Sequence, residues 1–367
     1  MKSTIAAART ALSLCALAAC ILLGAELGAR LDDWLFERVA LTANPSSDDL
    51  ITRDERGRRG EPNARFKKWR LNNFGFRGPD IALEPRTGTP RILILGASET
   101  FGLYESPDSE YPALLRTANR AHLEIINTAV VGMGLPAMTL YWQRQLNALR
   151  PDEVLIYPSP LFYLADEPVS APKAAAVAPP PSSTRPNPPL RSRFLDRLRG
   201  FLHKPDFLQI WLDRRAIESE LAARPGERMF QEVPPERLDA FQSDLEHLVE
   251  VIQASGARVR LMTHAIRLRG DEPDLENAFA VWEERVYTPR ASGQILVAFN
   301  SAANQRLRAV AAARGVGVID VSAAVSGCHA CFGDLVHFTD LGAQKVAATI
   351  QRAITTTDPD GAGHAVQ

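Results

Sequence analysis

Five short runs of apolar residues lie along the chain between residues 91 and 321. The runs cover residues 91–96, 123–130, 153–158, 257–264 and 316–321. Runs of this length are typical of strands that are buried on both faces of a parallel sheet. Between the runs, apolar residues recur at every third or fourth position, as at Leu245, Leu248 and Ile252. This helical period predicts helices at 109–121, 135–149, 236–254, 298–314 and 340–354.

The alternation of strands and helices predicts an α/β fold with three layers, α/β/α. We expect a flavodoxin-like parallel sheet of about five strands, joined by right-handed crossovers. Ligands of such sheets bind beyond the carboxyl ends of the strands. Ser98 lies in this position because it follows the first apolar run.

The pattern divides the chain into four parts. Residues 1–30 form an N-terminal membrane anchor or signal, and residues 31–90 an irregular connecting segment in which Phe74 and Phe76 attach the chain to the core. Residues 91–354 form the α/β domain, and residues 355–367 a flexible tail. The domain carries an insertion at 165–234. We expect a mobile, proline-rich surface loop at 165–193 and helices that cover the site at 194–234.

The N-terminal apolar run has three interpretations. Residues 10–25 carry no charge, and a spanning helix needs about 20 apolar residues. The run is an uncleaved anchor, a cleaved signal peptide, or a lipoprotein signal that ends at Cys20. The apolar residues continue past Cys20, and Leu23 and Leu27 stand where signal cleavage requires small residues. We therefore favour the anchor.

Charge and cysteine content restrict the partners. The formal net charge is −1, so no overall field favours nucleic acid, and acidic residues interrupt a basic run at 53–70. That run is interpreted as a solvated surface, with contact to anionic lipid or polysaccharide as the alternative.

Cys328 and Cys331 are compatible with a zinc site, a redox motif, two free thiols or a local disulfide. We favour the disulfide and expect no metal and no cofactor.

Three residues have the side chains of a nucleophilic site. A serine hydroxyl becomes a nucleophile when a base accepts its proton, and a carboxylate commonly orients that base. Asp334 and His337 are three positions apart, which places both side chains on the same side of a turn. Asp334 would then bind Nδ1 of His337 and leave Nε2 facing Ser98. Thr339, two residues after His337, is placed to cap the last predicted helix.

Three segments resemble the conserved blocks of the SGNH/GDSL hydrolases: residues 96–102 (GASETFG), 127–134 (NTAVVGMG) and 334–342 (DLVHFTDLG). The resemblance covers about residues 70–354 apart from the insertion. It implies a catalytic triad of Ser98, His337 and Asp334, and ester hydrolysis or acyl transfer. It also implies an oxyanion hole made by the backbone N–H groups of Ser98 and Gly132 and by an asparagine side chain.

The sequence departs from the family pattern at two positions. Ala97 stands where the first block has an aspartate, which is outside the triad. The third block lacks its asparagine, and Ser159, between two prolines, is the remaining candidate for the third oxyanion donor. The prolines limit where the hydroxyl of Ser159 can point.

The anchor, the 74–78 segment (FGFRG) and the motifs together resemble bacterial envelope members of the family. The resemblance implies a serine esterase or O-acyltransferase that acts on acyl (acetyl) esters of an envelope glycan, or on small esters. Transfer would require a polytopic membrane acyltransferase as partner, to supply the acyl group. The alternative is a degenerate domain that binds glycan or scaffolds a polysaccharide-assembly complex without turnover. We expect a single-pass inner-membrane protein whose domain faces the periplasm.

Overall fold

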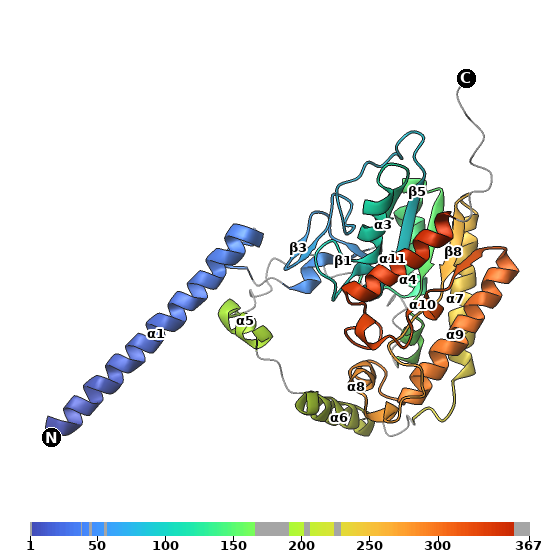
Figure 1. Ribbon diagram of the computed structural model, residues 1–367. Helices are drawn as coiled ribbons and strands as arrows, with labels where there is room; N and C mark the ends of the chain where they lie inside the picture. The colour runs from blue at the N-terminus through green and yellow to red at the C-terminus, as the bar shows by residue number, and fades with distance from the viewer. Residues whose placement is uncertain are drawn as a thin grey trace.

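The computed structural model describes residues 2–37, 39–43, 46–54, 57–165, 191–201, 206–223 and 229–355. A five-stranded sheet lies at its centre, in the order β6-β5-β7-β8-β9, and every pair of neighbours is parallel (Figure 1). This is the flavodoxin-like order, so the predicted fold class is confirmed. The strands are β5 (Arg91–Gly96), β6 (Glu124–Asn127), β7 (Glu153–Tyr157), β8 (Arg258–Met262) and β9 (Gly317–Ile319).

Helices cover both faces of the sheet. Alternate residues of β5 enter different cores: Leu93 and Leu95 pack with one set of helices, Ile92 and Ile94 with the other. The first set is α4 (Leu135–Arg144), α7 (Pro235–Gln253) and α9 (Gly293–Arg314), and the second is α3 (Tyr111–Asn119), α10 (Val321–Val325) and α11 (Asp340–Thr355). The five predicted helices are therefore present, with shifted ends.

The segment before the sheet contains two short hairpins that the hydrophobic pattern did not predict. They pair β1 (Ile51–Asp54) with β2 (Gly57–Gly60) and β3 (Arg65–Phe66) with β4 (Trp69–Arg70). Phe76 is fully buried in the core, and Phe74 packs against it, as expected from the sequence. Arg77 is also buried, and it forms an ion pair with Glu110 at 3.0 Å. This segment is therefore packed onto the α/β domain.

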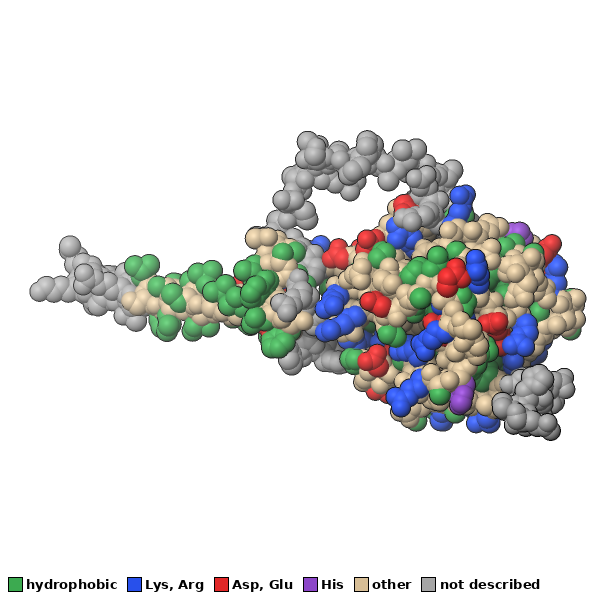
Figure 2. Space-filling view, turned by 90° about the horizontal axis from the view of Figure 1, so that it is seen from above, with side chains coloured by type: hydrophobic (Ala, Val, Ile, Leu, Met, Phe, Trp, Pro, Cys, Tyr) green, Lys and Arg blue, Asp and Glu red, His purple; other side chains and the backbone are tan. Residues whose placement is uncertain are grey.

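The first helix, α1 (Lys2–Glu37), extends away from the domain (Figures 1 and 2). Its part from Leu12 to Phe36 is apolar and long enough to cross a membrane. In the most apolar stretch of this part, 6% is buried inside the protein. The prediction of an apolar N-terminal helix is therefore confirmed at the level of length and composition. Short helix α5 (Arg193–Phe201) meets the end of α1 that is nearer the domain, where Arg193 pairs with Asp33 at 3.0 Å.

The insertion contains a second helix, α6 (Asp206–Ala223), which lies near α8 (Phe279–Arg285) in Figure 1. Two predicted helical segments at 194–234 are thus present as α5 and α6. The predicted mobile loop at 165–193 and the flexible tail at 355–367 fall almost entirely outside the described residues.

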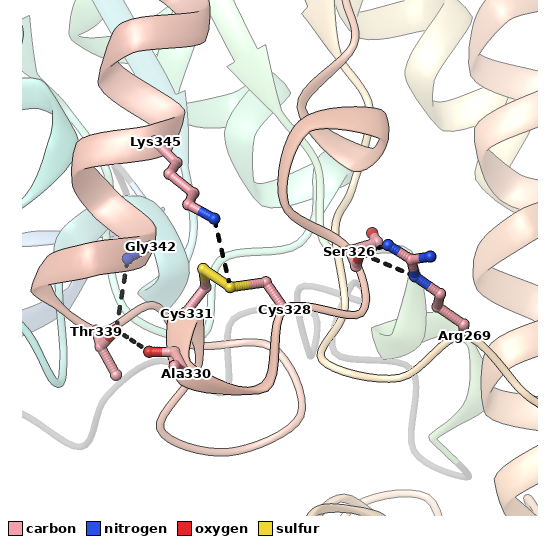
Figure 3. Close-up of a disulfide and its surroundings, with 8 residues drawn as sticks. All are labelled: Arg269, Ser326, Cys328, Ala330, Cys331, Thr339, Gly342 and Lys345. Atoms are coloured by element: carbon pink, nitrogen blue, oxygen red, sulfur yellow. Dashed lines mark hydrogen bonds between the residues drawn. A yellow bond between two sulfur atoms is a disulfide. The ribbon is translucent and has the colours of Figure 1, made fainter. Parts of the chain in front are cut away.

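The predicted disulfide between Cys328 and Cys331 is present (Figure 3). It closes a single turn, η5 (His329–Cys331), just before the segment that carries Asp334. The same turn is tied to the start of α11, because Thr339 donates its hydroxyl hydrogen to the carbonyl of Ala330 at 2.8 Å. The disulfide thereby fixes the loop between α10 and α11.

Candidate active site

Ser98 stands at a sharp transition from strand to helix. Strand β5 ends at Gly96, Ala97 has φ −101° and ψ −142°, and Ser98 opens the single-turn helix α2 (Ser98–Phe101). A Cβ atom on Gly96 would lie 2.2 Å from Oγ1 of Thr100, so the turn requires glycine there. The backbone thus places Ser98 at the carboxyl edge of the sheet, as the sequence predicted.

Asp334 and His337 form the expected pair. Oδ2 of Asp334 lies 2.6 Å from Nδ1 of His337, and Oδ1 accepts hydrogen bonds from the backbone N–H groups of Val336 and His337. The carboxylate therefore fixes the ring. Nε2 of His337 is buried and has no hydrogen-bond partner among the described residues. It is the atom that would accept a proton from a serine hydroxyl.

The groups around His337 favour its protonated form. Burial alone lowers the pKa of His337, but the hydrogen bond and charge of Asp334, followed by the charges of Glu99 and Glu284, raise it to about 9. For the carboxyl group of Glu284 burial acts in the opposite direction: together with the charge of Asp334, it raises the pKa to about 7. Tyr104 contacts the imidazole, with ring centroids 5.7 Å apart. The base of this site is therefore a strong one that is largely protonated at neutral pH.

This pKa predicts the pH profile of any reaction that uses His337 as a base. Below its pKa the ring carries a proton on Nε2 and cannot accept another, so only the small neutral fraction reacts. We expect kcat/KM to rise about tenfold per pH unit between pH 6 and 8 and to level off near pH 9, since kcat/KM reports the free enzyme. Initial rates of ester hydrolysis, corrected for spontaneous hydrolysis, measure this profile. A plateau that begins at pH 6 would contradict it.

The two predicted backbone donors of the oxyanion hole are available. The N–H groups of Ser98 and Gly132 donate to no other group in the described part of the chain. Gly132 has φ +68°, and Arg58 donates to the carbonyl of Val131 at 2.7 Å, so the guanidinium lies over this turn. Ser159, the candidate third donor, is 7% exposed, but its hydroxyl donates to Oε1 of Glu99 at 2.7 Å. In this state it does not provide a free donor.

A second buried pair, which the sequence pattern did not reveal, lies next to the nucleophile. The hydroxyl of Ser98 donates to Oε2 of Glu99 at 3.2 Å instead of to His337. Oε1 of Glu99 lies 3.3 Å from Nε2 of His264, and both side chains are buried. His264 is the last residue of the predicted strand 257–264 and therefore lies at the sheet edge where ligands bind. The position of His264 at the end of a predicted strand is the feature of the sequence that could have indicated a place in the site.

The site residues that follow the strands lie at one edge of the sheet, and the charge of His337 acts on Glu99 beside Ser98. Ser98 follows β5, Ser159 follows β7 and His264 follows β8, which are neighbouring strands. Asp334 and His337 approach from the segment before α11. In the described ranges, no group of three or more His, Cys, Asp or Glu side chains is placed to hold a metal ion. The chemistry available from these side chains is nucleophilic attack assisted by proton transfer.

Comparisons with known proteins give low similarity. No family model and no curated protein matches the chain. Solved structures that it resembles include a lipolytic protein of the G-D-S-L family from Veillonella parvula (11% identity, TM-score 0.41, 73% of this chain and 99% of that one). Another is a lipase/acylhydrolase from Enterococcus faecalis (16% identity, TM-score 0.42, 73% of this chain and 96% of that one). A third is an acetyl xylan esterase from Geobacillus stearothermophilus (16% identity, TM-score 0.41, 73% of this chain and 95% of that one). At these TM-scores we base no functional conclusion on the likeness.

Proposed function

We propose that the chain is a membrane-anchored serine esterase or O-acyltransferase that acts on acyl esters, in particular acetyl esters, of an envelope glycan. One observation carries the proposal. The Asp334–His337 pair leaves a buried Nε2 without a partner, among the described residues, at the sheet edge that also holds Ser98 and two free backbone N–H donors. A domain that only binds a ligand has no need for an oriented imidazole with one unpartnered nitrogen.

The reaction follows from these atoms. Oγ of Ser98 attacks the acyl carbonyl carbon while Nε2 of neutral His337 takes the hydroxyl proton. The carbonyl oxygen becomes an oxyanion, which the N–H groups of Ser98 and Gly132 stabilise. When the intermediate collapses, the C–O bond to the glycan breaks and His337 returns the proton to the leaving oxygen. Water then releases the acyl group from Ser98 in hydrolysis, or an acceptor hydroxyl removes it in transfer.

The proposed location and substrate have their own support. The disulfide between Cys328 and Cys331 favours an oxidising compartment, and α1 is suited to a single pass through the inner membrane. The domain would then face the periplasm. Tyr104, 51% exposed beside His337, offers an aromatic face on which a sugar ring can pack. Transfer would further need a polytopic membrane acyltransferase as partner, because an acyl donor must reach the periplasm.

The experiment that tests the proposal uses the detergent-solubilised full chain. We expect slow release of short acyl groups from activated esters, and release of acetate from an O-acetylated glycan. A fluorophosphonate probe should label the chain at Ser98, which peptide mass spectrometry can localise. Acetate that appears on an added acceptor glycan instead of in solution identifies transfer.

The rival function is glycan binding without turnover by a degenerate domain that scaffolds a polysaccharide-assembly complex. A specific observation favours it: Glu99 holds the hydroxyls of both Ser98 and Ser159, so neither is directed at His337 or at an oxyanion. A chain that binds glycan but neither reacts with the probe nor cleaves any short-chain ester would establish this function.

A further inference from the structure

The buried carboxylate of Glu99 contacts three strand ends of the sheet. It follows Ser98 in the chain, is 2% exposed, and accepts hydrogen bonds from the hydroxyls of Ser98 at 3.2 Å and Ser159 at 2.7 Å. Nε2 of His264 lies 3.3 Å from the same carboxylate. A buried carboxylate is costly unless it is paired and hydrogen-bonded, so these partners explain how it is tolerated. None of them belongs to the predicted triad apart from Ser98.

The surroundings of His264 determine where its protons lie. Nδ1 lies 2.6 Å from Oδ1 of Asn300. That amide is oriented by its own Nδ2, which donates to the backbone carbonyl of His264 at 3.2 Å, so Oδ1 is the atom that faces the ring. An amide oxygen only accepts, and therefore Nδ1 must carry a hydrogen. Because Nε2 faces a carboxylate oxygen, the second nitrogen also has an acceptor in front of it.

The neighbours of Glu99 favour its ionised form. Burial by itself raises the pKa of Glu99, but the hydrogen bond and charge of His264, with the charge of His337 and the hydrogen bond of Ser159, lower it to about 2. Glu99 is therefore an ionised carboxylate that accepts hydrogen bonds from its neighbours. Both ring nitrogens of His264 face oxygen acceptors, so every hydrogen bond of the pair is made when Glu99 is a carboxylate and each ring nitrogen carries a hydrogen.

This pair has a consequence for catalysis. An ester attacked by Ser98 develops negative charge within a few ångströms of the Glu99 carboxylate, and an uncompensated carboxylate there would oppose that charge. His264, with a hydrogen on each ring nitrogen, cancels this charge, and the carboxylate keeps the hydroxyl of Ser159 when that of Ser98 turns to His337. The cation is itself anchored by Asn300 and, through its backbone N–H, by Asn304 at 2.8 Å. It is thus fixed before any substrate binds.

We propose that Glu99 and His264 are positioning residues of the proposed esterase site: Glu99 holds the hydroxyl of Ser159 and the resting hydroxyl of Ser98, and His264, with a hydrogen on each ring nitrogen, neutralises Glu99 so that the anionic transition state can form beside it. The inference rests on the proposed function, and it assigns a role to two residues outside the triad. His337 remains the base, since the ionised Glu99 is far too weak a base to retain the serine proton.

The test is a cycle of Glu99→Gln, His264→Gln and the double variant, each made in the full chain. His264→Gln leaves the carboxylate unpaired, and we expect kcat to fall about 10²–10³-fold with KM changed less than about threefold. Glu99→Gln removes the charge and keeps the shape, so it should cost about tenfold or less. The double variant should be faster than His264→Gln alone, because the unpaired charge is gone. His247→Gln, on the exposed surface of α7, is the matched control and should leave kcat unchanged.

A second measurement does not depend on the variants folding. Nitrogen-15 spectra of the histidine-labelled parent should show both ring nitrogens of His264 protonated at pH 7, and Glu99→Gln should shift this signal toward a neutral ring. If the parent is active and His264 is neutral, the inference about Glu99 and His264 is wrong while the proposed function stands. The same holds for a double variant that is slower than His264→Gln. A parent without esterase activity overturns the proposed function, and with it the catalytic role of Glu99 and His264, whatever the spectra show.

Discussion

Replacement of Ser98 by alanine is expected to reduce ester turnover by about 10⁶-fold, the loss found when a triad serine is removed. His337→Ala should be equally severe, because the hydroxyl of Ser98 then has no strong base. The full chain in detergent, assayed with an activated short-chain ester at pH 9, provides a large signal, since about half of the imidazole is neutral there. Fluorophosphonate labelling should disappear in Ser98→Ala.

Ser159→Ala is the comparison that gives this result its meaning. Ser159 is a buried serine in the same network, but its hydroxyl donates to Glu99 and its backbone lies beyond β7. We expect a loss of no more than about 10²–10³-fold, the range for one oxyanion donor. If both serine variants lose the same small fraction of activity, neither hydroxyl is the nucleophile and the measured hydrolysis does not come from this site.

The strands of the sheet were predictable because burial on both faces gives continuous apolar runs in the sequence. All six residues of β5 and all five of β7 are buried, so both strands appear in the sequence as apolar runs. Periodicity likewise indicated the helices, whose apolar faces cover the sheet. The hairpins β1–β2 and β3–β4 escaped prediction because their strands are short and half of the strand residues are charged, so they give no apolar run. Hairpins of this size depend on contact with the rest of the protein for their stability.

The site was predictable only where its residues are close in sequence. The spacing of Asp334 and His337 indicated their hydrogen bond, and the CxxC spacing of Cys328 and Cys331 allowed their disulfide. Glu99 and His264 are 165 positions apart, and their contact follows from the order β5-β7-β8, which the apolar runs alone do not determine. A rule that inspects every polar residue at the carboxyl end of a buried strand would have selected both.

The geometry of the serine was not predictable from the motif. The motif implied that Ser98 faces His337, whereas the structure directs its hydroxyl to Glu99. The hydroxyl of Ser98 must therefore leave Glu99 before His337 can take its proton.

The second large effect is expected at the acid of the triad. Asp334→Asn should lower kcat/KM by about 10⁴-fold, because an amide can stabilise the wrong tautomer of His337 and cannot balance the imidazolium that forms. The carboxylate also raises the pKa of His337, so its loss should move the rise in kcat/KM to lower pH, below the value of about 9. Initial rates from pH 5 to 10 measure both effects.

Asp239→Asn serves as the matched control for this substitution. The side chain of Asp239 is 65% exposed on α7 and pairs with Arg306 at 3.0 Å, far in sequence from the site residues. Its rate and profile should equal those of the parent. If Asp334→Asn keeps the profile of the parent and loses less than about tenfold in rate, another carboxylate orients the ring. Glu284, whose charge also acts on His337, would then be the residue to replace, because the acid of the triad would come from α8 instead of from the loop that the disulfide fixes.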